Sequence, residues 1–92
     1  MVRLKLMPPL TWLVGEQEIA VDMARAPLKA VLEQAAAQNG KFRTSMLDAE
    51  GNLASEYSCL INDKQYNASD LAGIEVKDGD EIAIILPLSG GA

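Results

Sequence analysis

The feature that most constrains the fold is an almost continuous apolar run at residues 82–86. This run follows the turn sequence Lys77-Asp78-Gly79-Asp80 after a single residue, Glu81. A short apolar run after a turn predicts a strand that is covered on both faces, and such a strand belongs at the centre of a sheet. Since 92 residues provide for one small domain, the sheet must be arranged around this strand.

Two further strands are predicted near the N-terminus. Residues 2–6 alternate between apolar and charged side chains, which indicates a strand with one buried face. Pro8-Pro9 should end it, and Gly15-Glu16 offers a turn. A second short strand follows, with Ile19 and Val21 pointing inward, so the two strands should form a hairpin.

The clearest helix is predicted at about residues 27–39. Pro27 suits its first position, because the fixed φ and the missing N–H cost nothing there. Gly40 is expected to close the helix in the left-handed conformation. Its apolar stripe follows the helical spacing and consists of Leu28, Val31, Leu32 and Ala35.

The remaining elements are shorter, and the order of all of them indicates the fold class. Residues 41–53 are irregular with a turn at 48–52, residues 58–61 form a strand, and residues 65–66 return as a short edge strand. We therefore predict an α+β fold with a mixed sheet of four to five strands, one main helix, and a last strand parallel to the first. This is the ubiquitin-like β-grasp arrangement. Residues 1–86 would form the domain, and residues 87–92 a flexible C-terminal tail.

Composition excludes several classes of function. The chain has no histidine and a single cysteine, Cys59, so it lacks Ser-His and Cys-His nucleophile pairs, Cys/His zinc sites and internal disulfides. Its formal charge is −5, its basic residues are scattered and its aromatic content is 4%, which argues against nucleic-acid binding. No apolar stretch is long enough to span a membrane, and Pro8-Pro9 interrupts the only run that resembles a signal peptide. We expect a cytoplasmic protein that is not an enzyme.

Three further sets of side chains can be interpreted from their position in the sequence. Cys59 should serve packing, and the carboxylates at positions 78, 80 and 81 should form a solvated turn rather than a metal site. Met7, Leu10 and Trp12 leave two alternatives open: an exposed apolar patch that docks a partner, or a cap on one end of the core.

The C-terminal region resembles a known family. The segment from Asp78 to Ile85, followed by Pro87-Leu88-Ser89-Gly90-Gly91, resembles the C-terminal signature of the MoaD/ThiS sulfur-carrier family. Members show a D-G-D-E turn, an apolar strand, a proline and a terminal Gly-Gly. Residues 47–53 and 60–63 are similar to the middle of the MoaD-like branch.

The resemblance implies a chemistry carried by the end of the chain. A MoeB/ThiF-like adenylating enzyme would use ATP to activate the carboxyl group of Gly91, and the carrier itself would bind no cofactor or metal. The product would be a thiocarboxylate that passes sulfur to a biosynthetic enzyme, or an amide link to target-protein lysines. Glycine lacks a Cβ, so Gly90 and Gly91 would pass through a narrow channel, with Pro87, Leu88 and Ser89 also recognised.

Ala92 departs from the family pattern, because the simplest carriers end at the second glycine. One explanation is a precursor from which a JAMM-type metallopeptidase removes Ala92 and exposes Gly91. The other is an added residue or a deliberate block. We expect the precursor.

Overall fold

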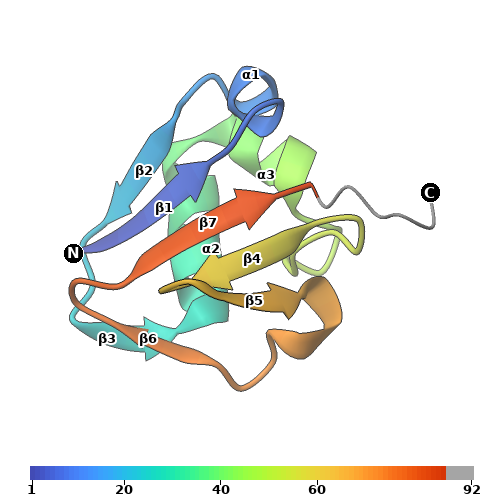
Figure 1. Ribbon diagram of the computed structural model, residues 1–92. Coiled ribbons are helices and arrows are strands. Elements are labelled where there is room, and N and C mark those ends of the chain that lie inside the picture. Colours follow the sequence, from blue (N-terminus) through green and yellow to red (C-terminus); the bar gives the residue numbers. More distant parts are fainter. Residues whose placement is uncertain (87–92) are drawn as a thin grey trace.

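The computed structural model describes residues 1–86 and shows a mixed five-stranded sheet with helices packed on one face (Figure 1). The strand order is β2-β1-β7-β4-β5. The bounds are β1 Val2–Leu6, β2 Glu18–Val21, β4 Ser58–Ile61, β5 Lys64–Asn67 and β7 Glu81–Ile85. These strands confirm the predicted α+β, ubiquitin-like β-grasp fold.

β7 is the central strand of the sheet, as predicted. It runs parallel to β1, with Leu6 opposite Ile84, and antiparallel to β4. The prediction that both of its faces are covered is wrong. Ile84 is fully buried toward the helices, whereas Ala83 and Ile85 are half-buried on the opposite face of the sheet. Ile82 and Ile84 form the buried, helix-facing side of β7, and the alternate residues Ala83 and Ile85 lie on the open face.

The main helix, α2, spans Leu28–Gln38 and crosses the sheet. Pro27 precedes the helix instead of opening it. It has an extended conformation and ends β3 (Arg25–Pro27), which pairs with β6 (Glu75–Lys77) in a separate two-stranded sheet. Because no side chain caps α2, its first N–H group, from Leu28, donates a hydrogen bond of 2.8 Å to the carbonyl oxygen of Ile74.

Two short helices were not predicted, α1 (Leu10–Val14) and α3 (Gly40–Met46). Gly40 does not close α2 in a left-handed conformation, as the sequence suggested, but begins α3. The side chain of Asn39 accepts a hydrogen bond of 3.0 Å from the backbone N–H of Phe42, which is the N-cap that starts this new helix. A single 3₁₀ turn, η1, spans Ala68–Asp70.

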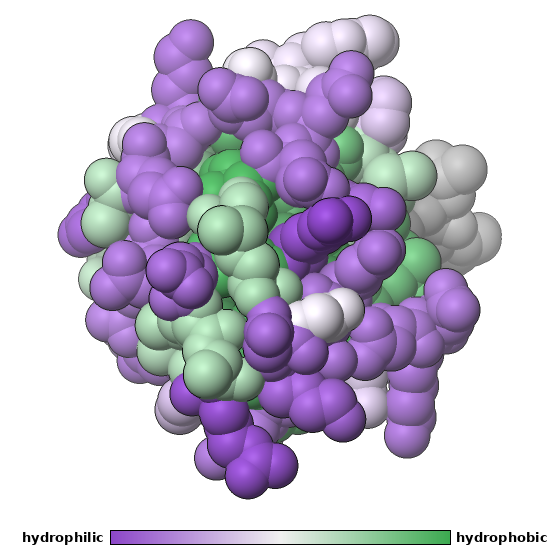
Figure 2. Space-filling model, turned by 90° about the vertical axis from the view of Figure 1, so that its left-hand side faces the viewer, coloured by the Kyte–Doolittle hydropathy of each residue, from purple (hydrophilic) through white to green (hydrophobic). Residues whose placement is uncertain are grey.

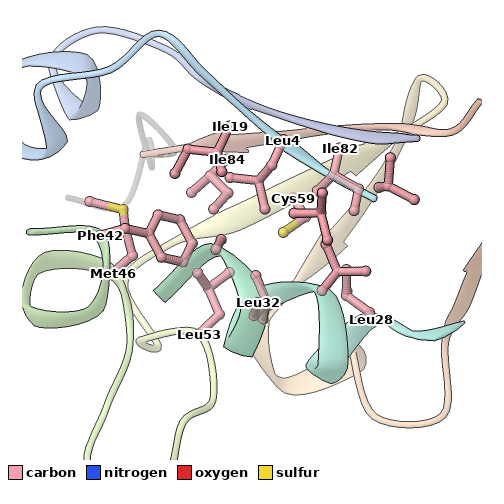
Figure 3. Close-up of a cluster of buried hydrophobic side chains, with 14 of the residues drawn as sticks. Leu4, Ile19, Leu28, Leu32, Phe42, Met46, Leu53, Cys59, Ile82 and Ile84 are labelled. Atoms are coloured by element: carbon pink, nitrogen blue, oxygen red, sulfur yellow. The ribbon is translucent and has the colours of Figure 1, made fainter. Parts of the chain in front are cut away.

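The core lies between the sheet and helices α2 and α3 (Figure 3). Phe42 and Met46 of α3 are fully buried against the end of the sheet, next to Leu53. Cys59 of β4 points into the same core and has no exposed surface. Burial raises the pKa of its thiol to about 12. The prediction that Cys59 serves packing is therefore confirmed.

No helix among residues 1–86 has the length and apolar character required to cross a membrane.

Candidate functional site at the end of β7

The sequence places the reactive site in the tail, which lies outside the described residues. This holds for the activated residue Gly91, for Ala92, and for the recognition segment Pro87-Leu88-Ser89-Gly90. The structure describes what precedes the tail: β7 itself, the turn before it, and the surface around Leu86, where the described chain ends.

A polar network fixes the beginning of β7. The carboxylate of Asp80 accepts hydrogen bonds from the backbone N–H of Lys77 (2.9 Å) and from the side-chain amide of Asn62 (3.0 Å). The side-chain oxygen of Asn62 accepts a third bond of 3.1 Å from the backbone N–H of Glu81. The Asn62 hydrogen bond, aided by that from Lys77, lowers the pKa of the Asp80 carboxyl group. The network joins the β4–β5 turn to the first residue of β7.

This network corrects one sequence-based expectation. Asp78 and Glu81 are exposed, as a solvated turn requires, but Asp80 is only 9% exposed and is fully engaged in hydrogen bonds. Asn62 was seen only as part of a turn. The signal for its role was the pair Asn62-Asp63 between two strands, since both residues have positive φ (49° and 74°), as a two-residue hairpin turn requires.

Among residues 1–86, no three histidine, cysteine, aspartate or glutamate side chains are grouped so that they could hold a metal ion.

The end of β7 lies beside the segment that follows β1. The backbone N–H of Met7 donates a hydrogen bond of 3.4 Å to the carbonyl oxygen of Ile84, so the contact between the two chain segments continues one residue beyond the end of β1. Met7 and Leu86 are both exposed, to 47% and 43%. The described chain therefore ends in an apolar surface.

The three residues suggested as either a docking patch or a core cap divide between the two alternatives. Leu10 is buried in the core, with 1% of its surface exposed, so it does not belong to an exposed patch. Met7 and Trp12 are exposed. Trp12 lies on α1, which packs against α3 through its other side.

A family comparison covers most of this framework. The family model described as the ThiS family matches residues 5–91, which include the end of β1, the turn before β7, β7 itself and the Gly90-Gly91 pair. The chain belongs to the ThiS family. This confirms the resemblance seen in the sequence, and members of this family are small carrier proteins rather than catalysts.

Solved structures show the same fold over nearly the full length of the chain. SAMP1 from Haloferax volcanii aligns with a TM-score of 0.75 at 22% identity, over 98% of this chain and 98% of that one. The small archaeal modifier protein 1 from Methanosarcina acetivorans aligns with a TM-score of 0.68 at 28% identity, over 98% and 95%. The Amycolatopsis orientalis BexX/CysO complex contains a chain that aligns with a TM-score of 0.73 at 20% identity, over 99% and 100%.

A comparison with curated proteins finds no significant match. The solved structures share the ubiquitin-like fold, and the family match makes the chain a ubiquitin-like protein of the sulfur-carrier or modifier kind.

Proposed function

We propose that this chain is a sulfur carrier that is adenylated on the carboxyl group of Gly91 and converted to a thiocarboxylate for biosynthetic sulfur transfer. The family match over residues 5–91, which ends at Gly91, is the observation that carries the proposal. The activating partner would be a MoeB/ThiF-like enzyme that uses ATP, and the acceptor a biosynthetic enzyme.

The chemistry requires a free carboxyl group on Gly91. Its carboxylate oxygen attacks the α-phosphorus of ATP and releases pyrophosphate; hydrosulfide then attacks the carbonyl carbon and AMP leaves. An ionised carboxylate is a poor electrophile at neutral pH, so the adenylate must come first. In the sequence Gly91 is bonded to Ala92, and this peptide bond has to be cleaved beforehand, in our proposal by a JAMM-type metallopeptidase.

The folded domain contributes to the same reaction by binding. Fixing a backbone segment in a channel costs about 1–2 kcal/mol per residue. Residues 87–91 would enter the channel of the activating enzyme, and contacts between that enzyme and the domain must offset this cost. The rigid attachment of β7, through the Asp80–Asn62 network and its pairing with β1 and β4, supports this arrangement.

The decisive experiment compares chains that end at Gly90, Gly91 and Ala92. Each is incubated with the MoeB/ThiF-type enzyme of the source organism, and ATP–pyrophosphate exchange is measured. We expect exchange with the chain that ends at Gly91 and only background with the other two. Equal exchange with the chain that ends at Ala92 would refute the requirement for cleavage, and no exchange with any chain would refute adenylation.

A second function is favoured by one comparison. The 28% identical protein from Methanosarcina acetivorans is described as a small archaeal modifier protein, so conjugation of Gly91 to target-protein lysines is the alternative. Enrichment of peptides that carry a Gly-Gly remnant on lysine, from cells with and without this chain, distinguishes the two. Remnants that depend on the chain support modification, whereas an oxygen-to-sulfur mass change on the intact chain supports sulfur transfer.

A further inference from the structure

α1 presents an aromatic side chain that the packing of the domain does not use. Trp12 is 79% exposed, the highest value among the large apolar side chains of residues 1–86. The same helix buries Leu10 and Val14, which are on its other side. The fold therefore uses α1 to cover the core and leaves the indole in solvent.

The surroundings of Trp12 have the composition of an interface. Two hollows meet at this side chain, of about 430 Å³ and 680 Å³. Lys5, Met7 and Pro8 line only the first, while Thr11, Gln17 and Glu18 border both. Residues 6–15 contain no charged side chain, although 23% of the whole chain is charged. Interface centres are depleted in charge and enriched in Trp and Met, and Trp is among the residues enriched at binding hot spots.

The position of this surface identifies its occupant. Met7 lines the first hollow and is joined to Ile84 through its backbone. From Leu86 to Gly91 the chain spans at most about 17 Å when fully extended. An enzyme that binds the carboxyl group of Gly91 must therefore approach the end of β7 closely, and its surface then faces Met7 and Trp12.

We infer that Trp12, with Met7 beside it, is an anchor that docks the adenylating enzyme, a step that rests on the proposed function. The partner would offer an apolar socket for the indole. Glu16 and Glu18 border the hollows, and Lys5, which lines the smaller one, is already paired with Glu81 at 3.0 Å. Basic side chains should therefore flank that socket. The contact would be equal in the ground state and the transition state of adenylation, so it should affect KM and leave kcat unchanged.

The test uses the chain that ends at Gly91 and the adenylating enzyme of the source organism. ATP–pyrophosphate exchange is measured against carrier concentration for the wild type, Trp12→Ala, Trp12→Phe and Leu13→Ala. We expect Trp12→Ala to raise KM at least tenfold with kcat within twofold, and Trp12→Phe to recover part of the loss. Leu13→Ala is the matched control, since Leu13 is an exposed residue of the same helix that lines neither hollow.

Three results would overturn the inference. The first is an unchanged KM for Trp12→Ala, and the second is an equal rise for Leu13→Ala. The third is a dimer of the wild-type chain in sedimentation that Trp12→Ala converts to a monomer, because the surface would then belong to a second copy. Exchange that is intact but insensitive to Trp12 defeats this inference alone, whereas absence of exchange with the wild type defeats the proposed function.

Discussion

At the beginning of β7 the chain is held by polar groups, and at its end it is surrounded by apolar ones. The first end contains the Asp80–Asn62 network, on the side of the molecule that Figure 2 shows covered mostly by hydrophilic side chains. At the second end Met7 and Leu86 are exposed, and Met7 shares a hollow with Trp12, in a segment without charge. The strand is thus fixed in space at one end and presented for contact at the other.

The polar residues at the first end should contribute to stability, and the apolar residues at the second end to binding. Hydrogen bonds to a nearly buried carboxylate are lost at a high cost when one partner is removed. Exposed apolar side chains contribute little to the folded state, and their removal should be felt only by a partner. The two ends should therefore respond differently to substitution.

Cys59 provides a probe of the strand between the two ends, since it lies opposite Ile84 in the register of β4 with β7. Burial raises the pKa of its thiol from 9.0 to about 12, so the thiolate at pH 8 is rarer by about a thousandfold. We expect native protein to react with a chromogenic disulfide reagent about a thousand times more slowly than protein unfolded in urea. Similar rates in both states would show that the sheet opens readily at β4.

Ile84→Ala should destabilise the domain by about 2–5 kcal/mol, because it removes a fully buried side chain at the centre of the sheet. Urea unfolding followed by circular dichroism measures the change. Ile85→Ala is the matched control, since this neighbour is half-buried on the open face, and it should cost clearly less. Equal losses would mean that the open face is as well packed as the core.

Asp80→Ala should destabilise by about 2 kcal/mol, because it leaves the N–H of Lys77 and the amide of Asn62 without their acceptor. Asp78→Ala, at an exposed carboxylate of the same turn, should cost less. Folding lowers the pKa of Asp80 below its ordinary value of 3.8. The stabilisation is therefore present above that value and is lost as the pH falls through the lowered pKa of the folded state. An unfolding free energy that falls equally at low pH in wild type and Asp80→Ala would contradict this.

Trp12→Ala should change the free energy of unfolding by less than about 0.5 kcal/mol, because the indole is mostly exposed. Thermal and urea unfolding measure this directly. A loss as large as that of Asp80→Ala would make Trp12 a structural residue, and the contrast between the two ends of β7 would fail.

The sequence predicted the elements that repeat regularly and missed those that depend on single caps. The alternation in β1 and the apolar run of β7 were enough to place both strands and their parallel pairing. α3 was missed because Gly40 fits a helix end as well as a helix start, and only the hydrogen bond from Phe42 to the Asn39 side chain distinguishes the two. α1 was missed because Pro8-Pro9 indicates a break and the helix has five residues only.

The candidate site was predictable to a different degree. The Gly90-Gly91 signature and its family could be recognised from the residues alone, and the family match confirms that assignment. The burial of Asp80 could not be recognised in this way. It depends on a hydrogen bond from Asn62, a residue of the β4–β5 turn that is distant in sequence. The division between buried Leu10 and exposed Trp12 likewise follows from the orientation of α1, which the sequence did not indicate.

The parallel pairing of β1 with β7 also determines when, during synthesis, the domain can fold. Arg3 of β1 pairs with Glu81 of β7. The centre of the sheet therefore cannot form until β7 has been synthesised. Contacts of such long sequence separation slow folding, because the chain loses the entropy of closing a large loop before these contacts stabilise it. A growing chain that has not yet reached β7 has β1 and β4 without their common neighbour. The domain therefore closes late, with nearly all of its residues already synthesised, and an incomplete chain would present two unpaired strand edges rather than a usable carrier.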